Sequence, residues 1–88
     1  ICSTGQGTSI TANKVKNIRS ALCINPTFAR LAREHNDANI ISLPADFINI
    51  EDAKTTVLVF LNTKFLGGRH ERRVNKIKMY EGGEYENL

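Results

Sequence analysis

The chain has 88 residues, of which 41% are hydrophobic and 24% charged, and its formal net charge at pH 7 is +3. This is the composition of an ordinary globular domain, so we expect residues 1–88 to form a single domain. No apolar run approaches the length of a membrane span, and the first residues lack the layout of a signal peptide, so we expect a cytoplasmic protein with no membrane partner. The mild positive charge suits small anionic ligands as well as nucleic acid.

The predicted elements alternate between helices and short strands. A glycine-rich turn at residues 3–7 is followed by a helix over 8–16 and by an apolar strand over 18–23. Asn25-Pro26 starts a second helix, with Asn as N-cap and Pro at the first helical position, and this helix ends between His35 and Asn39. A second strand over 40–43, a helix capped by Asn49 and a last helix over 69–80 follow.

Apolar spacing gives each helix a predicted inner face. The residues expected on these faces are Ile10, Ala12, Val15, Phe28, Leu31, Ala32, Ala53, Val57, Phe60, Leu61, Val74, Ile77 and Tyr80. Nearly continuous apolar strands that alternate with helices are typical of a parallel sheet covered on both faces. The sequence therefore predicts an α/β fold with a parallel sheet, in which two complete strands need further partners.

The turn Ser3-Thr4-Gly5-Gln6-Gly7 is the first candidate site. A turn between a strand and a helix presents backbone N–H groups to an anion, although such a turn also serves simply to reverse the chain. Neither the dinucleotide nor the Walker pattern of glycines is present. Cys2 stands at the end of the preceding strand, where a thiolate is favoured, but a buried Cys acting as a small hydrophobe fits that position as well.

Two further polar clusters stand out. Residues 33–37, Arg-Glu-His-Asn-Asp, come at a helix end, where a solvated face and a site role are both open. Arg69 and Arg73 are four residues apart on one helical face, a spacing at which two guanidinium groups can hold a phosphate. A basic helix that contacts nucleic acid is the alternative, but no recognised nucleic-acid motif accompanies it, so we expect no nucleic-acid partner. The two cysteines, Cys2 and Cys23, lack metal-ligand spacing.

Four blocks in order carry a resemblance to a known family. They are Cys-x-Thr-Gly-x-Gly-x-Ser-Ile-x-Ala-Asn-Lys-Val at 2–15, Ile-Arg-x-Ala-Leu-Cys at 18–23, Ala-Arg-Glu-His-Asn-Asp-Ala-Asn at 32–39 and Gly-Gly-Arg-His-x-x-Arg-Val at 67–74. Together they resemble ribose-5-phosphate isomerase B, with the galactose-6-phosphate isomerase subunits as close relatives. The resemblance runs from Cys2 to about Ile77 and corresponds to the C-terminal portion of a family chain.

The resemblance implies a three-layer αβα Rossmann-like sheet, here truncated at the N-terminus, and an aldose–ketose isomerase that needs no metal or cofactor. Its reaction would interconvert ribose 5-phosphate and ribulose 5-phosphate through an enediolate. Cys2 would be the base, Thr4 would help to hold the enediolate and His35 would assist ring opening. The substrate-binding residues implied in the same way are Ser3, Gly5, Gly7, Asn36, Arg69 and Arg73.

The family resemblance also implies partners and leaves alternatives open. The partners would be a phosphorylated sugar and a second copy of the chain, in a homodimer or higher oligomer with a site shared between subunits. The alternatives are a galactose-6-phosphate isomerase subunit and a non-catalytic remnant of the family. Two positions depart from the family pattern. Ser3 stands where Gly is usual, and Pro44-Ala45-Asp46 stands where Gly-x-Arg is usual, so an acid replaces a possible anion-facing Arg.

Overall fold

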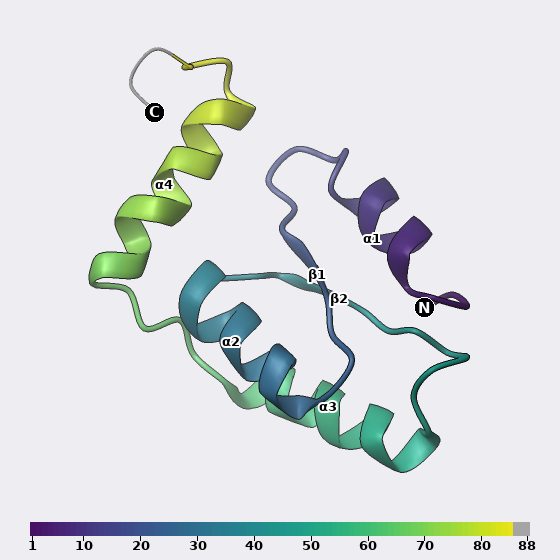
Figure 1. Ribbon diagram of the computed structural model, residues 1–88. Coiled ribbons are helices and arrows are strands. Elements are labelled where there is room, and N and C mark those ends of the chain that lie inside the picture. Colours follow the sequence, from purple (N-terminus) through teal and green to yellow (C-terminus); the bar gives the residue numbers. More distant parts are fainter. Residues whose placement is uncertain (86–88) are drawn as a thin grey trace.

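Figure 1 shows the computed structural model, which describes residues 1–85. The predicted alternation of helices and strands is confirmed. The elements are α1 (Gln6–Ala12), β1 (Ser20–Leu22), α2 (Pro26–Asn36), β2 (Ile40–Ser42), α3 (Ile50–Asn62) and α4 (Arg69–Glu81).

The strands are parallel, as predicted, and Ala21 of β1 lies opposite Ile41 of β2. Successive backbone carbonyls at Ser42 and Leu43 point toward opposite edges of this strand, so each pairs with a different neighbour. The Ser42 carbonyl accepts at 3.0 Å from the N–H of Cys23, the residue after β1, whereas the Leu43 carbonyl accepts from Cys2 N–H at 3.3 Å. Cys2 forms an isolated parallel bridge with Pro44. The order across the sheet is therefore the Cys2 segment, β2 and β1.

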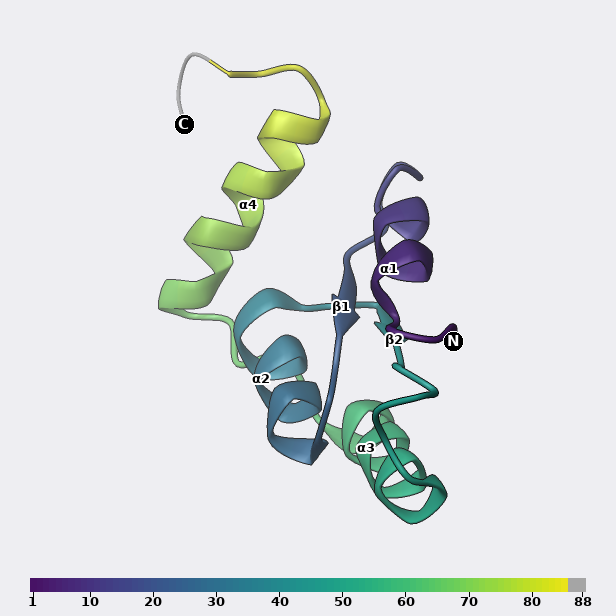
Figure 2. The ribbon, with the colours of Figure 1, turned by 45° about the vertical axis from the view of Figure 1, so that its right-hand side comes forward.

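This strand order places the helices in three layers. The connection from Cys2 to β1 crosses the sheet in one direction, and the connection from β1 to β2 returns in the other. Right-handed crossovers in opposite directions put their helices on opposite faces. Figures 1 and 2 show α1 and α2 on opposite sides of the two strands. The fold is a three-layer αβα arrangement with a parallel sheet.

The main core lies between the sheet and the layer of α2 and α3. Its members are small or apolar side chains: Cys23, Ala29, Ala32, Ala38 and Phe60 are buried, with Ala21, Ile41 and Val59 packed against them. The predicted start of α2 is confirmed, because the Asn25 side chain accepts from Phe28 N–H at 2.9 Å and Pro26 is the first helical residue. Asn49 caps α3 in the same way, through Asp52 N–H.

The bounds of the first helix were predicted wrongly, since α1 covers 6–12 and not 8–16. Gly5, at φ 73°, starts the helix two residues earlier than expected. The chain then turns because the Asn13 side chain bonds both backbone groups of Ser20, at 2.7 and 3.0 Å. The predicted strands 18–23 and 40–43 likewise shorten to 20–22 and 40–42.

Several predicted inner faces were also wrong. Ala29 and Ala32 face the sheet from α2, and the neighbouring Phe28 is consequently half exposed. In α3 the fully buried residue is Thr56, whose hydroxyl donates to the Asp52 carbonyl at 2.7 Å. The predicted inner residues that the structure leaves exposed are Ile10, Val15, Phe28, Leu61, Ile77 and Tyr80. α1 and α2 lie against a sheet of short strands, whereas α3 and α4 pack on α2, so each helix is covered along only a narrow stripe.

Candidate active site

The Cys2 turn is fixed by backbone pairing with the chain that follows β2. Besides the bond from Cys2 N–H to Leu43, Ala45 N–H donates to the Cys2 carbonyl at 2.8 Å and Asp46 N–H donates to the Ser3 carbonyl at 3.0 Å. Cys2 thus lies at the carboxyl end of its strand segment, as predicted. This is the edge at which parallel α/β sheets bind ligands.

Gly5 brings the turn against the sheet. Its φ of 73° is in the left-handed region, and a Cβ built there would lie 2.5 Å from Leu22 Cδ1 and 3.0 Å from the Leu43 carbonyl carbon. No other residue type combines this conformation with this close approach. Gly7 differs, because a Cβ there would meet nothing within 4 Å.

The Cys2 thiol is acidified by the first turn of α1. Cys2 Sγ lies 3.5 Å from Thr8 Oγ1. A hydrogen bond with the Thr8 side chain is the largest cause that lowers the pKa of Cys2 from 9.0 to about 7, and the Thr8 backbone N–H is the next; burial opposes them, and the Gly5 and Gly7 backbone N–H groups lower the pKa further. Burial has the opposite result at Cys23, where it raises the pKa to about 11. Cys2 is therefore the thiol that ionises near neutral pH.

Two polar side chains of the turn, Thr4 and Ser3, form hydrogen bonds of their own. Thr4 Oγ1 accepts from Gln6 N–H at 3.4 Å, and the Ser3 hydroxyl donates to Asp46 Oδ2 at 2.5 Å. Ser3 and Asp46, which both depart from the family pattern, are thus in direct contact. Sequence reasoning missed this contact as well as the Thr8–Cys2 pair, although Thr8 follows the second glycine of the turn directly.

A second cluster forms where the end of α2 meets the start of α4. Arg73 donates to Asn36 Oδ1 at 2.7 Å and to the His35 carbonyl at 2.9 Å. The His35 and His70 rings are stacked, with centroids 4.3 Å apart and an interplanar angle of 13°. Arg73 Nη2 also lies 2.9 Å from His70 Nδ1. The structure therefore brings His35, Asn36 and Arg73 together, and adds His70.

The pKa of His70 is lowered within this cluster. Burial is the largest cause of a lowered pKa at His70, followed by the charges of His35, Arg69 and Arg73, with Glu34 acting in the opposite direction. A neutral imidazole can accept at Nδ1 from the Arg73 guanidinium, which has donors only. Sequence reasoning missed this role, although His70 is three residues before Arg73 and hence on the same helical face.

The start of α4 forms a small basic cavity of about 370 Å³. Its lining residues are Arg69, His70, Arg72, Arg73 and Lys76. Both arginines predicted to bind phosphate are among them. Guanidinium groups at this spacing can hold a phosphate through paired hydrogen bonds.

The Cys2 turn and the basic cavity are not brought together within one chain. Cys2 lies beside Pro44, which follows β2, whereas His35 and Asn36 precede β2 at its amino end. Both views show the N-terminal turn and the start of α4 on opposite sides of the strands (Figures 1 and 2). A single chain thus carries two separate candidate half-sites, the Cys2 turn and the basic cavity.

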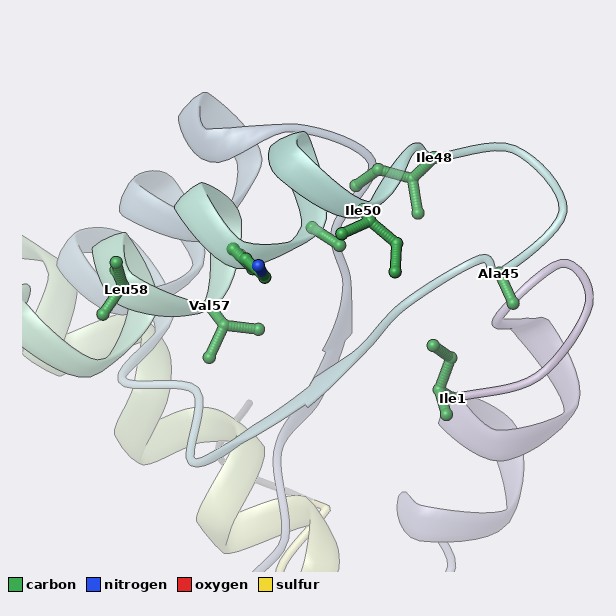
Figure 3. Close-up of a pocket in the computed structure, with 8 residues that line it drawn as sticks. Ile1, Ala45, Ile48, Ile50, Val57 and Leu58 are labelled. Carbon is green, nitrogen blue, oxygen red and sulfur yellow. The ribbon is translucent and has the colours of Figure 1, made fainter.

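A larger cavity of about 710 Å³ lies between the first residue and α3, as Figure 3 shows. Its lining is apolar apart from Lys54: Ile1, Ala45, Ile48, Ile50, Ala53, Val57 and Leu58. It lacks the converging polar groups that a sugar phosphate needs. Within residues 1–85, no helix is long and apolar enough to cross a membrane and no group of three His, Cys, Asp or Glu residues is placed to hold a metal ion.

The described residues thus form a parallel α/β sheet with a low-pKa thiol at its carboxyl edge and, apart from it, a basic cavity at the start of α4. The sequence profile of the ribose/galactose isomerase family matches residues 1–77, and the chain belongs to that family. Ribose-5-phosphate isomerase B of Escherichia coli is 42% identical over 81 residues, which cover 92% of this chain and 54% of the relative.

Solved structures agree with this assignment. The ribose-5-phosphate isomerase B of Clostridium thermocellum is 48% identical with a TM-score of 0.90, over 93% of this chain and 55% of that one. The enzyme of Mycoplasma genitalium, solved with bound ribulose 5-phosphate, is 42% identical with a TM-score of 0.90, over 92% and 53% of the two chains. The chain spans about half the length of the relatives that it matches.

Proposed function

We propose that the native protein is an aldose–ketose isomerase that interconverts ribose 5-phosphate and ribulose 5-phosphate. The observation that carries this proposal is the acidified Cys2 thiol, in a family whose relatives include ribose-5-phosphate isomerases. A proton carrier works best when its pKa is near the working pH, and a pKa of about 7 meets that condition.

The reaction moves one proton between two carbons. The Cys2 thiolate removes the proton from C2 of the open-chain aldose, and the C2–H electron pair becomes the C1–C2 double bond of an enediolate. The thiol then returns the proton to C1, while a proton moves from O2 to O1 and C2 becomes the ketone carbon. No oxidant or external reductant is consumed.

The turn after Cys2 would stabilise the enediolate. Thr4 and the backbone N–H groups from Gly5 to Gly7 are the proposed donors to its oxygens, and Ser3 completes the binding turn. Fixed donors stabilise developing negative charge without having to reorient. The close packing of Gly5 on Leu22 supplies the rigidity that this role needs.

The second half-site would hold the remote end of the sugar. Arg69 and Arg73 bind the phosphate, Asn36 binds the sugar and positions Arg73, and His35 assists ring opening. The stack of His35 on His70 supports the last role, because it limits the orientations of the His35 ring. Phosphate binding contributes energy that positions the reacting carbons.

The separation of the two half-sites supports a site shared between two copies. In this arrangement Cys2 of one chain and Arg73 of the other face the same substrate. The proposal therefore includes a homodimer, or a higher oligomer built from such pairs. A galactose-6-phosphate isomerase subunit is the second candidate, because the family also covers galactose isomerases.

The test measures turnover of ribose 5-phosphate, and separately of galactose 6-phosphate, by the native full-length chain. Cys2→Ala should lower kcat by about two to four orders of magnitude, the size of a general-base contribution. Cys23→Ala, which removes a buried thiol from the core beneath α2 and α3, should retain turnover. Unchanged turnover in Cys2→Ala would refute the assignment of the base, and no turnover in the unaltered chain would favour a non-catalytic remnant.

A mixing experiment tests the shared site. Cys2→Ala and Arg73→Gln should each be inactive as pure proteins. Reassembled together in equal amounts, they should recover about a quarter of the normal activity, because half of random dimers then contain one intact site of two. No recovery from stably mixed dimers would contradict sharing.

A further inference from the structure

We propose that the basic cavity at the start of α4 accepts two linked phosphoryl groups, so that an organic diphosphate binds there in competition with the sugar phosphate. The second phosphoryl group would lie on Arg72 and Lys76, beside the two arginines assigned to the phosphate of the sugar. The competition rests on the proposed function, whereas the binding of a diphosphate does not depend on it.

Arg72 and Lys76 line the same cavity as Arg69 and Arg73. Residues three or four positions apart are neighbours on a helix surface, and this spacing joins Arg72 both to Lys76 and to Arg69. Because a helix rises 1.5 Å per residue, the four positions fall within about 11 Å along the axis of α4. The cavity therefore carries two adjacent pairs of cations, of which the proposed function uses one.

The packing of α4 fixes the direction in which this second pair points. Val74 is buried, with 1% of its surface exposed. Arg72 and Lys76 are two positions before and after it, so they lie on the opposite side of the helix, and both are exposed. Arg73 ties the same turn of α4 to the end of α2 through its bond to Asn36 Oδ1 at 2.7 Å. The pair is thus held on a fixed helix face and is open to a ligand.

The positive charge of the cavity exceeds what one phosphate offsets. Among residues 1–85, the ion pairs within 4.0 Å are formed by other side chains, so no carboxylate neutralises these four cations at close range. A phosphate monoester carries about two negative charges at pH 7. About two positive charges would remain unmatched beside it, and like charges at short range repel. A second phosphoryl group in the same cavity offsets this repulsion.

The position of the second group defines the class of ligand. A second phosphate at the far end of the sugar would lie toward the Cys2 turn and not in this cavity. Two phosphoryl groups that share a bridging oxygen remain adjacent, as the two pairs of cations are. The cavity volume of about 370 Å³ lies at the lower end of the range for small-molecule sites. A diphosphate group therefore fits the arrangement of charge better than a sugar with a phosphate at each end.

The experiment compares inorganic phosphate with inorganic pyrophosphate by calorimetry on the native full-length protein, in one buffer without divalent metal. Pyrophosphate should bind at least about tenfold more tightly, which corresponds to one additional charge-assisted hydrogen bond. The double variant Arg72→Gln/Lys76→Gln should lose most of this advantage, while its Kd for phosphate changes by less than about threefold because the other pair remains and distant charges are screened. The control Lys14→Gln/Lys78→Gln removes the same charge from exposed lysines outside the cavity and should keep the advantage.

Two results would overturn the inference. One is an equal Kd for the two anions in the unaltered protein, and the other is an equal loss of the advantage in both double variants, which would be an effect of net charge alone. In the ribose 5-phosphate assay, pyrophosphate should raise KM and leave kcat unchanged; a lowered kcat at unchanged KM would refute the shared cavity. A protein that shows the expected pyrophosphate binding but no turnover would support the diphosphate site and refute the proposed function.

Discussion

Replacing Thr8 by Val should make Cys2 a weaker acid without removing any other group of the turn. The Thr8 hydroxyl is the largest cause of the lowered pKa, and its Oγ1 lies 3.5 Å from the sulfur. A thiol with a pKa of about 7 is about half ionised at pH 7, whereas one at 9.0 is about 1% ionised. Without the hydroxyl, we expect the pKa to rise to about 8 or higher, which lowers the thiolate fraction at pH 7 by about fivefold or more.

The assay is the rate of alkylation by iodoacetamide as a function of pH. Cys23 does not compete, because it is fully buried and burial raises its pKa to about 11. Thr8→Ser, which keeps the hydroxyl, is the matched control and should titrate like the unaltered protein; Cys2→Ala gives the background. If the midpoint of Thr8→Val stays at about 7, the hydrogen-bond explanation of the acidified thiol is wrong.

Three other predictions concern Gly5, Arg73 and His70. In a urea titration, Gly5→Ala should lower the free energy of unfolding by about 2–4 kcal/mol, because the added Cβ clashes with Leu22 and the residue has a left-handed φ. The control is Gly7→Ala, which adds a Cβ in open space within a helix and should leave the free energy of unfolding unchanged or raise it slightly. Arg73→Lys keeps the charge but should weaken phosphate binding by about tenfold or more, because one ammonium cannot bond Asn36, the His35 carbonyl and a phosphate in one plane as a guanidinium can. Calorimetry with inorganic phosphate measures this Kd, and an unchanged Kd would count against the role of Arg73. His70 has a pKa below 6.5 in the folded chain, so the unfolded chain binds more protons and stability should fall as the pH drops below about 6.5. Thermal melts at pH 7.5 and 5.5 should show a smaller acid loss in His70→Gln than in the unaltered protein, and an equal loss would argue against the assigned cause.

Sequence signals that act over a few residues were enough to predict the starts of α2 and α3 and the parallel sheet. The Asn25-Pro26 pair specifies a helix start by itself, because the cap and the fixed φ of Pro act over only a few residues. The short apolar strands and the helices between them likewise predicted a parallel sheet. Gly5 and Cys2 could be identified as parts of one turn because they are close in the chain.

The remaining features depend on contacts between distant residues. α1 ends at its C-cap Asn13, whose side chain bonds the backbone of Ser20 in β1. The helix propensities of the residues in α1 do not predict this end, because it depends on a residue seven positions away. Ser3 and Asp46 are 43 residues apart, so their contact follows only from the strand order. The same strand order places Cys2 and Arg73 apart within one chain. The family resemblance had assigned both residues to one site, shared between two subunits.

The strand order also has a consequence for how the chain folds. The Cys2 segment pairs with the residues after β2 and not with β1, the strand that follows it in the chain. The unit from β1 through α2 to β2 closes a short loop and can form early, whereas pairing at Cys2 must wait until the chain through Asp46 is in place. The reactive turn should therefore be the last part of the sheet to become protected from hydrogen exchange during refolding, so that a chain still being synthesised acquires its ordered thiol only after this unit has assembled.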